Sequence, residues 1–126
     1  MDTDDLDGLN EVTQKVIGCA YCVSNALGSG FLEKVYENAL AVEMRKSNLP
    51  FTQQQSIDIF YNRVLVGEYV ADFVVANSIL LELKAAKTID EVHQAQLMNY
   101  LKATQLRIGL ILNFGTPRLG IKRMML

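Results

Sequence analysis

Apolar residues recur at helical spacing over the first third of the chain. Between residues 9 and 27 they return every three or four positions, and Gly28 and Gly30 then interrupt the pattern. A second such pattern runs from about 31 to 47 and ends before Pro50. This spacing gathers apolar side chains on one face of a helix, and glycine and proline commonly end helices. The pattern therefore predicts two amphipathic helices.

After residue 50 the pattern becomes typical of strands, with turn residues at Asn62-Arg63 and Asn77-Ser78. Strands are predicted over residues 53–61, 64–76, 79–84, 107–114 and 121–126. A helical pattern from about 88 to 103 separates the third strand from the fourth. The resulting order, α-α-β-β-β-α-β-β, predicts an α/β sheet with helices packed on it.

Length and composition fit one folded domain spanning residues 1–126, of which half are hydrophobic and 21% are charged. Residues 1–8 are acidic, and we expect them to form a disordered tail. No apolar run approaches the roughly 20 residues of a membrane span, and the start lacks a signal-peptide pattern. These features exclude a membrane protein and predict a cytoplasmic location.

Cys19 and Cys22 have the C-x-x-C spacing but lie within the first helical pattern. No second pair of cysteine or histidine residues completes a zinc site. We expect two buried free thiols, with a thiol redox pair as the alternative.

The charge is unevenly distributed, although the net charge is only -2. Residues 1–60 contain nine acids and four bases, whereas residues 61–126 contain five acids and eight bases. The second half of the chain could therefore present a positive face to a polyanion. An ordinary solvated surface would have the same composition.

Three charged residues lie in apolar strands, where charge is costly unless it is paired or bound to an ion. They are Asp72 in the second strand and Glu82 and Lys84 in the third. Side chains alternate along a strand, so Ala71 and Phe73 should share one face and Asp72 the other. Glu82 and Lys84 share a face, and Asp72 lies beside Glu82 if the two strands form a hairpin.

The helices contribute further polar candidates. Gln96 falls near the middle of the apolar stripe predicted for the third helix, four residues before Tyr100, and His93 falls at its edge. On the second helix Glu33 is the acid best placed to point inward, while Glu37 is expected on the water side. Each residue has a structural explanation, such as an ion pair, a turn hydrogen bond or a surface charge. Their occurrence in one order favours a functional site.

The sequence also resembles a known family. Residues 30–36 match the pattern G-x-x-E-x-x-Y, after which the GxxExxY family of the PD-(D/E)xK nuclease superfamily is named. The resemblance continues through residues 67–72, 82–84, 93–102 and 113–115 and covers nearly the whole chain from about residue 16. It implies a restriction-endonuclease-like core, a mixed β-sheet flanked by helices.

The resemblance assigns roles to particular residues. Asp72 and Glu82 resemble the metal-binding acids, and Lys84 resembles the lysine of the E-x-K element. Glu33 resembles the helix acid found in many members. Gln96 and Tyr100 match a Q-x-x-x-Y element. Two positions depart from the pattern, since Ala71 replaces the proline of the superfamily's name and Val70 replaces an arginine often found there.

These roles imply a nuclease that uses Mg²⁺ or Mn²⁺. Asp72, Glu82 and the carbonyl of Leu83 would hold the metal, with Glu33 acting through water. Lys84, Gln96 and Tyr100 would complete the catalytic set. We expect nucleic acid as partner, DNA in preference to RNA, and a possible homodimer. The alternative is a binding or structural module that keeps the fold without turnover.

Overall fold

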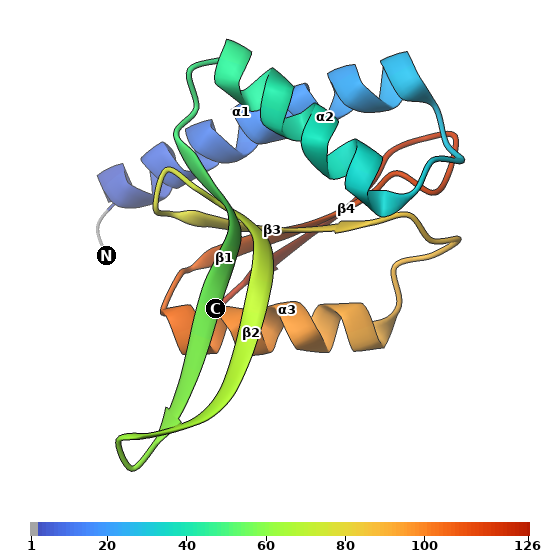
Figure 1. Cartoon of the computed structure of the whole chain (residues 1–126). Helices are drawn as coiled ribbons and strands as arrows, with labels where there is room; N and C mark the ends of the chain where they lie inside the picture. The colour runs from blue at the N-terminus through green and yellow to red at the C-terminus, as the bar shows by residue number, and fades with distance from the viewer. Residues whose placement is uncertain (1–2) are drawn as a thin grey trace.

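The computed structural model of the protein describes residues 3–126 (Figure 1). The helices are α1 (Thr3–Leu27), α2 (Glu33–Lys46) and α3 (Glu91–Thr104). The strands are β1 (Phe51–Tyr61), β2 (Val64–Val75), β3 (Ile79–Lys84), β4 (Ile108–Asn113) and β5 (Gly120–Met125). The predicted order of helices and strands is confirmed.

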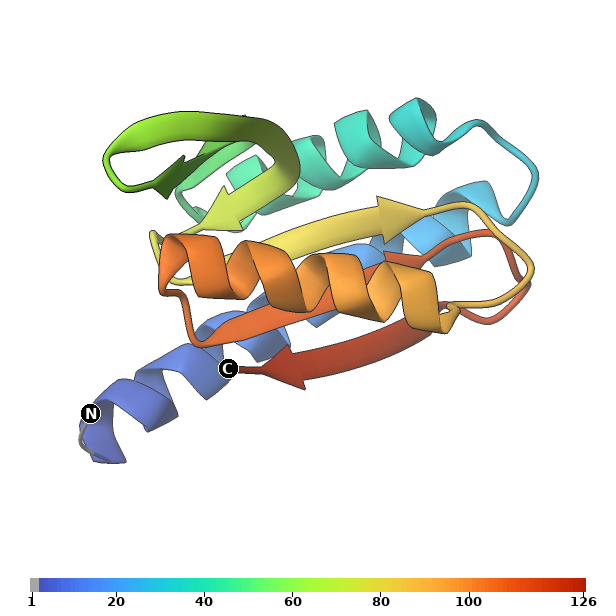
Figure 2. The same cartoon turned by 90° about the horizontal axis from the view of Figure 1, so that it is seen from below.

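The strands form one five-stranded sheet in the order β1-β2-β3-β4-β5. Neighbouring strands are antiparallel except for β3 and β4, which are parallel. A parallel pair needs a crossover connection, and α3 provides it. Helices α1 and α2 lie on one face of the sheet and α3 lies on the other (Figures 1 and 2). The mixed sheet flanked by helices is therefore confirmed.

Each face of the sheet has its own apolar core. The core beneath α1 and α2 includes Tyr36, Leu40, Phe73, Leu81 and Phe114. The core beneath α3 includes Ala71, Leu80, Leu97, Leu101 and Ile111. All six residues of β4 are buried, as are the first five of β3. Because helices cover both faces, the central strands read as nearly continuous apolar runs, and any carboxylate in β3 lies in apolar surroundings.

Helix α1 extends over most of the segment that was expected to be a tail. It begins at Thr3, whereas residues 1 and 2 lie outside the described residues. Acidic residues near a helix N-terminus interact favourably with the helix dipole. The acidic composition that suggested disorder is thus compatible with a helix start.

The two cysteines differ in their surroundings. Cys19 is buried, as expected, but Cys22 is exposed, and both thiols are free. Three residues turn a helix by roughly 300°, which moves Cys22 beyond the edge of the buried stripe of α1. The expectation of two buried thiols was therefore wrong for Cys22.

Strand β2 changes face at Asp72. Ala71 packs in the core beneath α3, whereas Phe73 packs in the core beneath α1 and α2. The prediction that both share one face was wrong, because it assumed an unbroken alternation. The β1–β2 register is the same on either side of Gln54, but Gln54 itself has a left-handed backbone with φ of 57°. The break lies opposite Asp72 and reorients this part of the hairpin.

The loop that follows β3 is held against the end of β4 by Asn113. Its buried side chain accepts hydrogen bonds from the backbone N–H groups of Ala86 and Gly115, both at 3.0 Å. It also donates to the carbonyl of Ala86 at 2.9 Å. A Cβ atom on Gly115 would lie 2.3 Å from the nitrogen and oxygen of Ala86. The close contact thus needs glycine and fixes the chain just beyond Lys84.

Within the described part of the chain, no helix combines the length and the apolar character that crossing a membrane requires.

Replacing Gly115 with alanine should destabilise the fold, because the new methyl group meets backbone atoms that cannot move without breaking the Asn113 contacts. We expect a loss of about 2–4 kcal/mol in the free energy of unfolding, measured by urea denaturation. Gly18→Ala is the matched control: nothing lies within 4 Å of its added Cβ, and alanine in mid-helix should stabilise by about 1 kcal/mol. Equal stability of Gly115→Ala and the unmodified protein would contradict this account.

Candidate active site

The candidate site lies where β2 and β3 separate. Their antiparallel ladder runs from Val75↔Ile79 to Phe73↔Leu81 and has no further backbone pair. Asp72 is the next residue on β2, and its Oδ2 accepts a hydrogen bond from the backbone N–H of Leu83 at 2.8 Å. A side-chain carboxylate thus replaces the backbone acceptor at the end of the ladder.

Glu82 is buried beside Asp72, with 7% of its surface exposed. Burial raises its pKa to about 9, and the negative charge of Asp72 adds to this effect. Its Oε1 atom is buried without any hydrogen-bond partner. Unpaired buried oxygens of this kind are rare because desolvation is costly. A cation bound between the two carboxylates would satisfy it.

Lys84 and Glu33 lie at the open side of the acid pair. Lys84 is half-buried at the end of β3. Glu33, the first residue of α2, has its pKa raised by partial burial, against the lowering effect of the Lys84 charge. The charge of Asp72 raises it further, and the backbone of Ala85 donates a hydrogen bond that lowers it. Glu33 is thus an exposed residue within electrostatic reach of Asp72 and Lys84.

The described residues contain no cluster of three or more histidine, cysteine, aspartate or glutamate side chains placed to hold a metal ion. The structure brings Asp72 and Glu82 together, while Glu33 is near them but outside a tight cluster. The donors nearest one another are thus two carboxylates and the backbone of Leu83.

Tyr36 explains how Glu33 is held at this position. The Tyr36 hydroxyl donates to the carbonyl of Gly28 at 2.7 Å and accepts from the N–H of Phe31 at 3.1 Å. Its ring is fully buried and stacks on Phe114 with 4.8 Å between centroids. The tyrosine therefore fixes the turn that leads into α2. Gly30 in that turn has φ of 118°, which only glycine adopts readily.

Glu37 is part of the site, although it was expected on the water side. It is 5% exposed and accepts hydrogen bonds from Lys34 at 2.9 Å, Gln53 at 2.5 Å and Gln54 at 3.0 Å. Burial alone would raise its pKa, but these hydrogen bonds outweigh burial and lower it. The prediction was wrong because the glutamines of β1 cover this side of α2, which helical spacing cannot show.

Gln54 links Glu37 to Asp72. Its side-chain amide donates to Glu37 Oε1 at 3.0 Å and to Asp72 Oδ1 at 3.3 Å. The left-handed backbone of Gln54 allows this reach from an edge strand. Together with the Leu83 N–H, this fixes both oxygens of Asp72. Sequence reasoning missed Gln54, and the only signal was its place in a run of three glutamines within a strand.

Helix α3 places a tyrosine hydroxyl on the other side of the acids. Gln96 Nε2 donates to the hydroxyl of Tyr100 at 2.8 Å, so the two residues act as a pair. Burial raises the pKa of Tyr100, and the charge of Glu82 contributes. The hydroxyl therefore lies within the electrostatic reach of the acid pair.

Gln96 itself is exposed, not central to the apolar stripe. The buried face of α3 is formed by Leu97, Tyr100 and Leu101. The predicted stripe was displaced because it included Ile89, which precedes the helix, and Val92, which is 74% exposed.

His93, expected at the edge of the apolar stripe, caps α3. Its N–H donates to Asp90 Oδ1 at 3.2 Å, and its Nδ1 accepts from the N–H of Asp90 at 3.4 Å. The histidine therefore has a structural role at the helix start.

A groove of about 760 Å³ adjoins the site between β1–β2 and α3. Tyr69, Gln96 and Tyr100 are among the residues that line it, and Lys102 is the one charged residue of that lining. No carboxylate lines this groove, which is therefore compatible with an anionic ligand.

Comparison with known proteins identifies the family of this chain. The sequence matches the family model of the PD-(D/E)XK nuclease superfamily over residues 10–124. No curated protein was found to match it. Among solved structures it is similar to the crystal structure of SSO0001, with a TM-score of 0.54 and 20% sequence identity. The similarity covers 92% of this chain but 58% of that one, and at this identity it supports the fold alone. Since the family match covers nearly the whole sequence, the chain belongs to the PD-(D/E)XK nuclease superfamily.

Proposed function

We propose that this protein is a nuclease of the GxxExxY type that hydrolyses phosphodiester bonds with the aid of Mg²⁺ or Mn²⁺. The observation that carries the proposal is the buried, unpaired Oε1 of Glu82 beside the carboxylate of Asp72. Two adjacent carboxyl groups, one of which is buried and has an oxygen without a hydrogen-bond partner, are unfavourable for the stability of a core. A divalent cation bound between the two carboxyl groups would remove this cost.

The donors at this point suit a hard cation. Asp72 and Glu82 offer carboxylate oxygens, and Glu33 lies close enough to contribute through water. In an extended strand the N–H and C=O of one residue point to the same edge. Because the N–H of Leu83 points to Asp72, its carbonyl is directed to the same side. Carboxylate, carbonyl and water oxygens are the ligands that Mg²⁺ prefers.

A bound metal would supply Lewis-acid activation of water and of the phosphoryl group. The protein's own residues would position the substrate. Lys84 places a cation beside Glu33 and Glu82, where it orients the attacking water and offsets negative charge that develops on phosphorus. Since Gln96 donates to the oxygen of Tyr100, the Tyr100 hydroxyl proton remains free to bind a phosphate oxygen.

The groove beside Tyr100 is the proposed path of the nucleic acid strand. It is lined by Lys102 and by the Gln96–Tyr100 pair, and no carboxylate is among its lining residues. We infer DNA as the substrate in preference to RNA, and the assay below compares both. A binding module without turnover would show the opposite outcome, nucleic acid binding with no cleavage under any metal condition.

Lys84→Ala should abolish cleavage while leaving the fold intact, because the lysine is only half-buried, at the end of β3. We expect a loss of at least about 100-fold in rate, measured on single- and double-stranded DNA and RNA with Mg²⁺, Mn²⁺ or EDTA. Lys87→Ala, three residues further along an exposed loop, should cleave like the unmodified protein. Cleavage that persists in Lys84→Ala would place the activity elsewhere.

Glu82→Gln should stabilise the metal-free protein at alkaline pH. With a pKa of about 9 against an ordinary 4.5, folded Glu82 keeps a proton that the unfolded chain has lost across this window. Stability of the metal-free protein therefore falls as pH rises from about 4.5 towards 9, and the glutamine variant lacks this slope. At pH 8 we expect the variant to be more stable by about 1–3 kcal/mol.

Urea denaturation in EDTA at several pH values measures this difference, with the exposed Glu11→Gln as control. Added Mn²⁺ should then raise the melting temperature of the unmodified protein and leave that of Glu82→Gln unchanged. An unaltered pH profile in Glu82→Gln would mean that the carboxyl is not the buried acid described.

Gln54→Gly should separate two effects of this residue: the hydrogen bond that its side-chain amide donates to Asp72, and the strain of its left-handed backbone. Glycine accepts a left-handed conformation, so stability should be kept, but Asp72 loses a hydrogen bond. Outer contacts of metal ligands typically contribute 10- to 100-fold in affinity, and we expect Mn²⁺ affinity to fall by roughly tenfold in calorimetric titration.

Gln54→Ala should lose both affinity and stability, whereas Gln55→Ala should lose neither, because the Gln55 side chain bonds only to the exposed backbone of Ser56. Unchanged Mn²⁺ affinity in Gln54→Gly would remove Gln54 from the site.

A further inference from the structure

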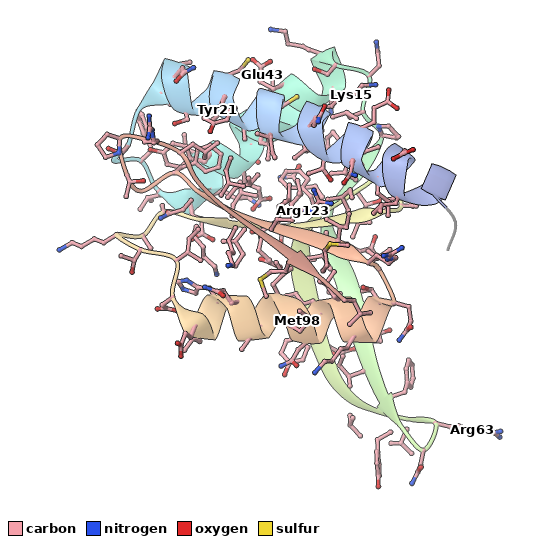
Figure 3. The ribbon with its side chains drawn as sticks, turned by 180° about the vertical axis from the view of Figure 1, so that it is seen from behind. Lys15, Tyr21, Glu43, Arg63, Met98 and Arg123 are labelled. Atoms are coloured by element: carbon pink, nitrogen blue, oxygen red, sulfur yellow. The ribbon has the colours of Figure 1, made fainter. Side chains whose placement is uncertain are left out.

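The β1–β2 hairpin extends beyond the body of the protein as an arm, defined here as residues 58–70 (Figures 1 and 3). Its large apolar side chains are 44 to 69% exposed. They are Phe60, Tyr61, Val64, Leu65, Val66, Tyr69 and Val70. Single exposed apolar residues are ordinary, but this many large apolar side chains exposed on the two faces of one hairpin mark an interaction surface.

The edges of the arm are also open. β1 is the outermost strand of the sheet, and β2 pairs with β3 only over residues 73–75. Among the described residues, therefore, no third strand pairs with the arm. Natural proteins usually protect exposed strand edges with charge, proline or a covering element, and here the tip is apolar on both sides of the turn.

The charged residues of the arm differ in sign between its tip and its base. Arg63 lies in the turn at the far end, where Figure 3 shows it pointing away from the body. Asp58 and Glu68 face each other directly across the two strands, nearer the base. Like charges at directly opposed positions are unfavourable. The arm thus carries a cation at one end and a directly opposed acidic pair about five residues away.

We propose that the arm binds the arm of a second copy of this chain, the two arms packing antiparallel about a two-fold axis. In this arrangement each Arg63 meets the Asp58–Glu68 pair of the other copy. That pair lies roughly 15 Å from the tip of the arm that carries it, at 3.3 Å per residue. The same contact forms twice, as a two-fold interface requires. The same arm carries both the cation, Arg63, and the acidic pair, Asp58 and Glu68. The complementary partner is therefore a second copy of this chain, not a protein of different sequence.

The apolar side chains of the arm divide between its two faces, because side chains alternate along a strand, so each copy buries only those of one face. The apolar residues of that face would form the centre of the interface, and the charged residues its rim. This inference uses the arm alone and does not depend on the proposed nuclease activity.

Analytical ultracentrifugation of the full chain tests the proposal. The unmodified protein should sediment as a dimer at concentrations of about 100 µM and dissociate on dilution. Val66→Lys, which places a charge at the apolar centre, should be monomeric. The control Val42→Lys changes a valine that is 52% exposed on α2 and should remain dimeric. A monomer in the unmodified protein, or a dimer in Val66→Lys, overturns the proposal.

A charge exchange then identifies the contact itself. Arg63→Glu and Glu68→Arg should each weaken dimerisation by about tenfold or more, because each brings like charges together across the axis. The double variant Arg63→Glu/Glu68→Arg should recover most of the lost affinity. Circular dichroism should show that all variants are folded, as every changed side chain is exposed. Failure of the double variant to recover overturns the antiparallel arrangement.

Discussion

The candidate site depends on one hydrogen bond, from the backbone N–H of Leu83 to the carboxylate of Asp72. Because the Asp72 side chain accepts this bond, β2 can separate from β3 without leaving the N–H of Leu83 unsatisfied. Glu82 directly precedes Leu83 on β3, a strand covered on both faces. The same bond therefore holds the backbone next to Glu82 against Asp72. The result is an acid pair held in apolar surroundings, which opposes stability and which the proposed function assigns to cation binding.

Three contacts outside the acids keep this arrangement in place. The Tyr36 hydroxyl fixes the turn before Glu33, the Asn113 side chain fixes the loop after Lys84, and Gln54 fixes Asp72. Each of these contacts holds either a backbone segment or a carboxylate group, and each acts on a different part of the fold. Preorganisation of this kind is what allows donors from distant segments to act together. It also explains why the signature glycine and tyrosine matter although neither touches the acids.

Much of the fold could be predicted because hydrophobic period and turn residues are local. β3 was predicted at its observed residues, and the proximity of Asp72 and Glu82 follows from two strands joined by a short turn. Features that depend on packing could not be predicted. Neither the left-handed backbone of Gln54 nor the change of face at Asp72 leaves a periodic signal. The burial of Glu37 requires knowledge of which strand covers α2, and the orientation of Gln96 depends on where α3 begins.

The continuity of β2 has a thermodynamic consequence. β2 runs from the turn of the hairpin past Asp72, with one register shift against β1 between Ile59 and Phe60. The same strand therefore contributes both to the projecting arm and to the acid pair. Any coupling between a partner on the arm and a cation at Asp72 would be reciprocal, each changing the affinity for the other by the same factor.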